Sequence, residues 1–274
     1  MASANYDARD SGTEAASSTP GWLVVAGQEV RDLWLAGRGP IVVLAFSLLL
    51  SALTYLAATN KELNLLDQKD TVNLIMQVTL AVGVALALLL SADAVSGERE
   101  RGTLEALLLT PLGPREIGLG KLLAALTVWP VAVAVSVPYA WALRPGSGLF
   151  TDAVLSEIVV GTLVAVAFAS FGIVVSTFSS TNRVSLAVSF FVFVALVVPT
   201  QLPGGVAKGW LGDLWSRVNP LTAGAHFMDK VIVSDHTWSQ EATWLLSPIL
   251  AALIAAVAAV VLTGRLRLHG GIGR

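Results

Sequence analysis

Residues 71–95 read TVNLIMQVTLAVGVALALLLSADAV, a run whose only charged side chain is that of Asp93. An α-helix rises about 1.5 Å per residue, so about 20 apolar residues are enough to cross the roughly 30 Å hydrocarbon core of a bilayer. A soluble domain would instead surround its core with charged side chains. The stretch therefore predicts a helix that spans a membrane.

The rest of the chain repeats this pattern. Of its 274 residues, 55% are hydrophobic and 13% are charged, about half of the charged share of a typical soluble domain. The charged side chains fall into short clusters between long apolar runs. The six predicted spans cover residues 40–59, 71–95, 119–142, 154–178, 184–200 and 243–263. The sequence therefore predicts an all-α integral membrane protein with six transmembrane helices, all within residues 40–268.

Charge and residue usage exclude several classes of function. The net charge is −2, so there is no basic excess for binding nucleic acid. The chain has no cysteine, which excludes disulfides, thiolate metal sites and cysteine nucleophiles. Its three histidines, His226, His236 and His269, lack metal-ligand spacing, and no Gly-x-Ser-x-Gly motif indicates a hydrolase. We therefore predict no metal site, no cofactor in this chain and no catalytic residue.

Lys and Arg are unevenly divided between the two sides of the predicted spans. Eleven lie on the side of the N-terminus: Arg9, Arg31, Arg38, Arg99, Arg101, Arg115, Lys121, Arg183, Arg265, Arg267 and Arg274. Six lie opposite: Lys61, Lys69, Arg144, Lys208, Arg217 and Lys230. Because positive side chains favour the cytoplasmic side, the bias predicts a multi-pass protein of the cytoplasmic membrane with both termini in the cytoplasm. Residues 1–20 are predicted to be a disordered tail and residues 269–274 a second cytoplasmic tail.

Before the first span, residues 21–39 have the pattern of an amphipathic helix. Ala26, Val30, Leu33 and Trp34 recur at helical spacing on one face. The pattern predicts a helix along the cytoplasmic interface of the membrane, either as a simple anchor or as a contact for a cytoplasmic partner. The residues assigned to this interface helix are Glu29, Arg31, Asp32, Leu33 and Trp34.

The polar segment between the second and third spans, residues 96–113, reads SGERERGTLEALLLTPLG. Thr103 can cap a short cytoplasmic helix that Pro111 ends. Three leucines on one side of that helix would face the cytosol without cover: Leu104, Leu107 and Leu108. A charged rim around an apolar patch is typical of a protein contact. The alternative is an ordinary inner loop whose arginines only set the topology.

This segment also resembles a known family. The string from Gly97 to Glu105, GERERGTLE, is similar to the signature of the type-2 ABC exporter permeases. Weaker matches that extend it are Leu107 and Leu108, Thr110 and Pro111, Gly120 to Leu122, Glu29 to Leu33, and Asn219 to Thr222. The resemblance covers residues 21–268.

The resemblance implies a permease subunit of an ATP-driven exporter, which transports and is not itself an enzyme. It implies two copies of an ABC ATP-binding subunit, which would bind ATP and magnesium, and a second permease subunit in a homodimer or heterodimer. The ATPase-coupling residues that it implies are Glu98, Arg101, Thr103, Leu104, Glu105, Leu107 and Leu108. It also implies an extracytoplasmic re-entrant segment within residues 201–242, and some members of the family act with an extracytoplasmic partner protein.

No ATP-binding domain is expected within the chain itself. Gly118 to Lys121 reads GLGK, like the end of a phosphate-binding loop. However, Arg115 stands where that loop needs a glycine, and Leu122 lacks the hydroxyl that binds magnesium. The sequence therefore predicts that another polypeptide hydrolyses the ATP.

Polar residues inside two predicted spans are candidates for a translocation path. They repeat every four residues: Ser47, Ser51 and Tyr55 in the first span, and Asn73 and Gln77 in the second. The serines can instead bond to their own helix backbone, whereas the amides are expected to face a partner helix or a cavity.

Two other functions stay open as alternatives. An ATP-independent secondary transporter would favour inverted repeats and charged groups inside the spans. A membrane scaffold or an intramembrane enzyme is the other, and the enzyme would need an acidic or histidine pair inside the spans. Neither pattern is evident, because Asp93 and Glu157 are expected at the membrane boundaries. The leading prediction is ATP-driven export by alternating access, with a substrate that the sequence does not identify.

Overall fold

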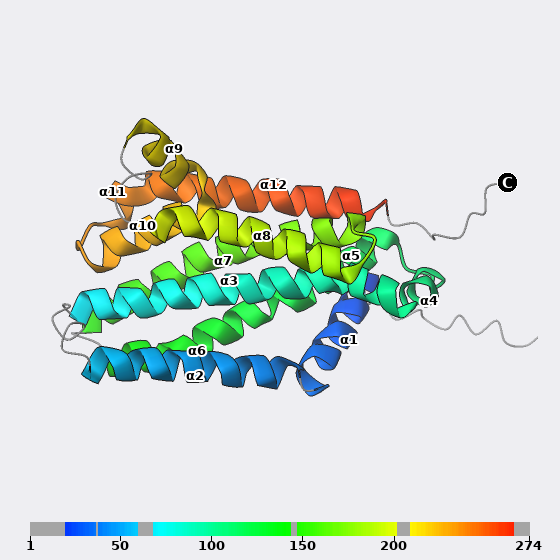
Figure 1. Ribbon diagram of the computed structural model, residues 1–274, viewed down its shortest axis with the longest axis horizontal. Coiled ribbons are helices and arrows are strands. Elements are labelled where there is room, and N and C mark those ends of the chain that lie inside the picture. The colour runs from blue at the N-terminus through cyan, green and yellow to red at the C-terminus, as the bar shows by residue number, and fades with distance from the viewer. Residues whose placement is uncertain (1–19, 37, 60–67, 144–146, 202–208, 266–274) are drawn as a thin grey trace, which may run out of the picture.

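The computed structural model describes residues 20–36, 38–59, 68–143, 147–201 and 209–265. In these ranges every regular element is a helix, so the predicted all-α class is confirmed. Figure 1 shows the long helices side by side, with α4 (Leu104–Leu108) at one end of the bundle and α9 (Trp210–Val218) at the other. The predicted tails lie almost wholly outside the described residues.

Five segments are long and apolar enough to cross a membrane. They are α2 (Arg38–Thr59), α3 (Gln68–Arg101), α5 with α6 (Pro114–Leu126 and Val128–Ala142), α7 (Ser147–Phe178), and α11, η2 and α12 in succession (Trp238–Glu241, Ala242–Leu245 and Leu246–Thr263). The predicted span at residues 184–200 coincides with α8 (Asn182–Gln201), whose apolar part, Asn182–Val197, is shorter. The structure therefore supports five of the six spans directly, and the count of six stays a prediction.

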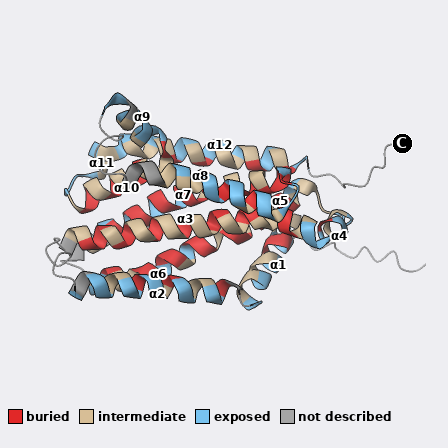
Figure 2. Cartoon of the chain, in the orientation of Figure 1, coloured by how far each residue is buried: buried red, intermediate tan, exposed pale blue. Residues whose placement is uncertain are grey.

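Burial is greatest in the middle of the bundle and least on its outer helices (Figure 2). In α3, Met76 and Leu88 are fully buried, and Val164 of α7 packs in the same core. By contrast, α12 exposes Leu253 and Ile254 to 59% and 68%. Such an apolar outer surface is expected where the surrounding solvent is lipid, whose chains are as apolar as leucine.

The close packing of α3 on α7 depends on a glycine. A Cβ atom at Gly172 would meet the Ser91 hydroxyl and lie 2.6 Å from the backbone oxygen of Leu88. Small residues at helix contacts let two backbones approach, and this approach is the main source of packing energy between helices in a membrane.

Replacing Gly172 by Ala is therefore expected to destabilise the protein by about 1–3 kcal/mol, because the added methyl group overpacks a backbone contact. The measurement is the midpoint of thermal unfolding in detergent. Gly27→Ala is the matched control, since it is also a helical glycine but has no atom within 4 Å of its Cβ position. That control should gain up to about 1 kcal/mol from helix propensity. Equal effects of the two substitutions would contradict the packing explanation.

The predicted interface helix is present as α1 (Gly21–Leu35), and its apolar face packs against its own chain. A Cβ at Gly120 of α5 would lie 2.7 Å from the Val25 side chain, and the Trp34 indole N–H donates to the Thr127 hydroxyl at 3.0 Å. The amphipathic pattern is thus explained by packing on α5. Residence of α1 at a membrane interface stays a prediction.

Glu157 is expected at a membrane boundary, and its depth in the membrane stays a prediction, but its side chain is buried within the protein. The residue lies inside the apolar segment Phe150–Phe178 and is 0% exposed. Neither carboxylate oxygen has a hydrogen-bond partner among the described residues. Its neighbours in sequence, Ser156 and Val160, are also fully buried, which a linear pattern of apolar residues with one acid did not reveal.

The segment predicted to be re-entrant contains three short helices in its described part: α9, α10 (Pro220–Ile232) and α11. Asn219 caps α10, because its side-chain oxygen accepts from the Leu221 N–H at 3.1 Å. Its side-chain amide also donates to the Leu196 carbonyl at 2.7 Å and so connects α10 to α8. Residues 202–208, with Pro203, lie outside the described residues.

Candidate functional site

A tight turn at Gly102 and Thr103 connects the end of α3 to α4. Gly102 has φ +72°, and its N–H donates to the Arg99 carbonyl at 3.2 Å. The N–H of Thr103 donates to the Glu98 carbonyl at 3.0 Å. These two bonds form a Schellman motif, whose left-handed position favours glycine. Gly102 therefore ends α3 and turns the chain into α4.

Thr103 stands at the N-cap position of α4, as predicted, but its side chain does not cap the helix. Its hydroxyl donates back to the Glu98 carbonyl at 3.3 Å. Because that carbonyl belongs to the last turn of α3, Thr103 stabilises the turn between the two helices. Its predicted helix-capping bond is replaced by this contact.

The expectation that three leucines lack cover is wrong. Leu104 is 5% exposed and packs with Val95, Leu122 and Ile173, and Leu108 is half-buried against the same cluster. Leu107 is also half-buried, whereas Leu109 is 76% exposed. The apolar side of this five-residue helix therefore packs on α3, α5 and α7. The side chain left for a partner is Leu109, which the helical spacing did not single out.

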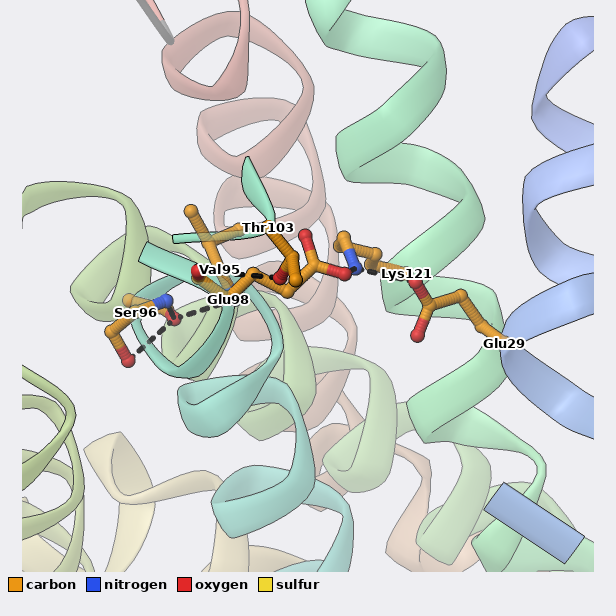
Figure 3. A network of polar contacts seen from close by, with 7 residues as sticks. Glu29, Val95, Ser96, Glu98, Thr103 and Lys121 are labelled. Atoms are coloured by element: carbon orange, nitrogen blue, oxygen red, sulfur yellow. Dashed lines mark hydrogen bonds and ion pairs between the residues drawn. The ribbon is translucent and has the colours of Figure 1, made fainter. Parts of the chain in front are cut away.

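A buried lysine connects three of the predicted elements (Figure 3). Lys121 of α5 is 1% exposed, and its Nζ donates to Glu29 Oε1 of α1 at 2.5 Å and to Glu98 Oε1 of α3 at 2.6 Å. A buried ammonium group has to be paired, and charge-assisted bonds of this kind are among the strongest in proteins. The interface helix, the coupling region and the third span therefore meet at one ionic cluster, Glu29–Lys121–Glu98.

Part of this cluster could be recognised in the sequence, because Lys121 is an isolated charge among apolar residues. Lys121 stands alone in the apolar run GLGKLLAAL, and a lysine in such a run needs an acidic partner if it is buried. Glu29 and Glu98 were already assigned to separate sites. Their meeting required the packing of α1 on α5, which no local pattern shows.

A cavity of about 340 Å³ lies beside the cluster, bounded by α1, α3 and α5. Its lining includes the charged residues Glu29, Asp32, Asp93, Glu98, Arg101 and Lys121. Acidic groups outnumber basic ones there, and Glu98 Oε2 has no hydrogen-bond partner among the described residues. The α4 end therefore offers a recess next to the ionic cluster in which acidic side chains outnumber basic ones.

Polar contacts also tie the last turns of α3 to α7 and α8. The Ser176 hydroxyl accepts from the backbone N–H groups of Val95 and Ser96 at 3.1 and 2.9 Å. The Asn182 side-chain amide donates to Asp93 Oδ1 at 2.6 Å. Arg99 donates to the carbonyls that end α7, those of Thr177 (3.0 Å) and Ser179. In the sequence, Arg99 stands out for its charge and as part of the Gly97 to Glu105 string, and in the structure it caps the C-terminus of α7.

Other predicted residues lie on the surface of this end. Arg101 and Glu105 are exposed beside α4, and Arg31 and Asp32 are exposed on α1, with Leu33 half-buried. They are therefore placed where a separate protein can reach them. Among the described residues, no group of three or more His, Asp or Glu side chains is arranged to bind a metal ion.

The predicted translocation residues fall into two separate contacts. The Ser51 hydroxyl and the Tyr139 hydroxyl are 2.8 Å apart, and Tyr139 donates to the Ser47 carbonyl at 3.0 Å, so the serines connect α2 to α6. Asn73 donates to Asp229 Oδ1 of α10 at 2.9 Å. Tyr55 is 68% exposed and Gln77 half-buried. A single chain does not gather these residues around one described cavity, and their place on a path stays a prediction.

A family model described as ABC-2 family transporter protein matches residues 23–266 of the chain. Among curated proteins no sequence matches it. The match includes α1, α4, all five apolar spanning segments and the Glu29–Lys121–Glu98 cluster.

Proposed function

The chain belongs to the ABC-2 transporter family, and from that premise we propose that it is the permease subunit of an ATP-driven exporter. Membership makes it a multi-pass membrane component of an ABC transporter. We further propose that two ATP-binding subunits drive it and that it pairs with a second permease subunit. It would occupy the cytoplasmic membrane, with both termini in the cytoplasm.

The observation that carries the proposal is the Glu29–Lys121–Glu98 cluster. It lies close to α4, where Glu105 of that helix, Arg101 at the end of α3 and Leu109 directly after α4 are exposed on the outside of the chain. A force applied to α4 would therefore reach α1, α3 and α5 together. This is the arrangement that a coupling site between an ATPase and a set of spans requires.

The length of α3 supports transmission across the membrane. Its 34 residues extend about 50 Å at 1.5 Å per residue, and its opposite end is tied to α10 through Asn73 and Asp229. We infer that displacement of α4 tilts α3 and repositions α10, so that access alternates between the two sides. Ser47, Ser51, Tyr55, Asn73 and Gln77 would border the path in the paired permease, where the exposed face of α2 meets the second subunit.

One observation favours a second function. Glu157 is a buried acid without a partner among the described residues, and such groups inside spans are typical of proton-coupled transport. If transport were ATP-independent, Glu157→Gln would abolish it in vesicles driven by a proton gradient. The exporter proposal expects instead that transport requires ATP and persists in the Glu157→Gln variant.

The purified chain is expected to bind no nucleotide at micromolar concentration. Its GLGK string lies inside α5, where Gly118 packs on Thr263 and Lys121 is already bonded to two carboxylates, so no backbone loop is free to surround a phosphate. The measurement is equilibrium binding of a fluorescent ATP analogue. Saturable binding by the chain alone would contradict the prediction.

The proposal as a whole is tested with the complex. The tagged permease is purified from its own membranes, a co-purifying ABC ATPase is identified by mass spectrometry, and the pair is reconstituted in liposomes. ATP hydrolysis above that of the isolated ATPase is the expected result. A permease that purifies without an ATPase and does not stimulate one would overturn the exporter assignment.

A further inference from the structure

The end of the bundle opposite α4 carries α9, a helix with several exposed apolar side chains. α9 exposes Trp210, Leu214 and Val218 to 73%, 52% and 63%. Its C-terminal end is attached through the Val218 carbonyl, which accepts from the Ser247 hydroxyl at 2.7 Å, and through Arg217, whose guanidinium carbon lies 4.9 Å from the centre of the Trp244 ring. α9 is therefore joined to the start of the last span through Trp244 and Ser247.

Trp244 contacts a second side chain as well. The imidazole of His226, on α10, has its ring centre 4.0 Å from that of Trp244, with the planes tilted by 38°. One indole thus joins α9, α10 and the 3-10 turn that precedes α12. Both partners can carry a positive charge, and an aromatic ring attracts a cation through its π-face.

The charged groups around His226 come from each neighbouring element. Lys230 and Asp229 belong to α10, Glu241 to α11 and Arg217 to α9. Burial lowers the pKa of His226 below its ordinary value of 6.5, Lys230 and Arg217 lower it further, and Asp229 and Glu241 oppose them. Asp229 is bonded to Asn73, and Glu241 is bonded to His236. His226 is thus neutral near pH 7, which leaves Arg217 as the cation on the indole.

We propose that Arg217, Trp244 and His226 form an acid-sensitive clasp, in which protonated His226 displaces Arg217 from the Trp244 ring and loosens the packing of α9 against the start of the last span. The two cations would lie within about one Debye length, 10 Å at 0.1 M salt, so they repel each other across the same ring. The proposal concerns this chain alone and does not depend on an ATPase partner.

The direction of the pH effect follows from the pKa of His226. Because the clasped arrangement lowers that pKa, it binds the neutral form better, and the clasp is at full strength above the ordinary histidine pKa. It weakens as the pH falls below about 6.5. α10 stays in place, because Asn73 and the Lys69–Asp235 ion pair connect it and the following turn to α3. The moving part is therefore α9.

The chain has no cysteine, so a single spin label reports on α9 without background. Leu214→Cys is labelled with a nitroxide, and the purified protein is placed in lipid nanodiscs, where both faces meet the same buffer. Between pH 8 and pH 5 we expect a several-fold rise in the mobile fraction of the electron paramagnetic resonance spectrum. A label at Leu250→Cys on α12 should show no such rise.

Two histidine variants decide the cause. His226→Gln should remove the pH response, whereas His236→Gln, which changes the histidine bonded to Glu241, should keep it. His226→Arg should give the mobile spectrum at every pH, because its charge is permanent. Thermal unfolding at pH 8 verifies that each variant is folded. An immobile label in the wild type at pH 5, or an unchanged response in His226→Gln, would overturn the clasp.

Discussion

Replacing Lys121 by Met is expected to abolish stimulated ATP hydrolysis in the complex and to destabilise the permease itself. The substitution leaves Glu29 and Glu98 facing each other without a cation, in a site where Lys121 is 1% exposed. Breaking a buried ion pair by removing one partner costs about 3–5 kcal/mol. Thermal unfolding of the permease and ATPase stimulation in liposomes measure the two effects.

Lys69→Met is the matched control for this substitution. Lys69 also forms an ion pair with a carboxylate, that of Asp235, but the two side chains are 29% and 70% exposed. Exposed pairs contribute about 0–1 kcal/mol, so this variant should behave like the wild type.

The triple variant Lys121→Met, Glu29→Gln, Glu98→Gln tests the cluster from the other direction. It removes the unpaired charges and should recover much of the lost stability, but not the coupling. A Lys121→Met protein with wild-type stability and normal stimulation would show that the cluster is neither structural nor part of coupling.

Replacing Leu109 by Asp should sharply weaken assembly with the ATPase while leaving the permease as stable as the wild type. Leu109 is 76% exposed at the end of α4, so it contributes little to folding and is available to a partner. Apolar anchors buried at protein interfaces commonly contribute about 2 kcal/mol or more, equivalent to at least about thirtyfold in affinity. Co-purification and a titration of ATPase stimulation measure the loss.

Leu104→Ala should have the opposite profile. Leu104 is 5% exposed inside its own chain, so truncating it opens a cavity and should lower the stability of the permease by about 2–5 kcal/mol. Glu105→Lys, at an exposed position, should reduce association by reversing a charge at the same surface.

Leu250→Ala on the outer face of α12 is the control for an exposed leucine that faces lipid. It should change neither assembly nor stimulation. If Leu109→Asp assembled and stimulated normally, α4 would be an ordinary loop helix and the docking surface would have to lie elsewhere.

The histidine clasp was not predictable, although each of its residues was visible. His226, Arg217 and Trp244 lie in three different elements, and the sequence offers His226 only as a possible metal ligand. Aromatic stacking between residues 18 positions apart depends on the angle at which α10 meets the last span, and no spacing rule contains that angle. The same limit applies to Tyr139, which bonds to the serines of α2.

The sequence by itself determined the class of the protein and the places of its helices. An apolar run of about 20 residues forms an α-helix in lipid, because the helix bonds the backbone N–H and C=O groups within the segment itself. The positions of Gly102 and Asn219 were likewise local decisions, since a left-handed turn and a helix cap depend on neighbouring residues alone. The family signature at Gly97 to Glu105 belongs to the same category, and the family match over residues 23–266 agrees with it.

Only the tertiary structure decided what the individual side chains do. Whether Leu104 or Leu109 is exposed depends on how α4 packs on the rest of the chain, and whether Glu157 is buried depends on which helices surround it. In the sequence, Lys121 is one of the positive charges that indicate the topology. In the structure, the packing of α1 on α5 brings Glu29 into an ion pair with it. Helix periodicity specifies which side chains share a face, but burial and ion pairing arise from contacts between segments far apart in the chain, here 92 residues for Lys121 and Glu29.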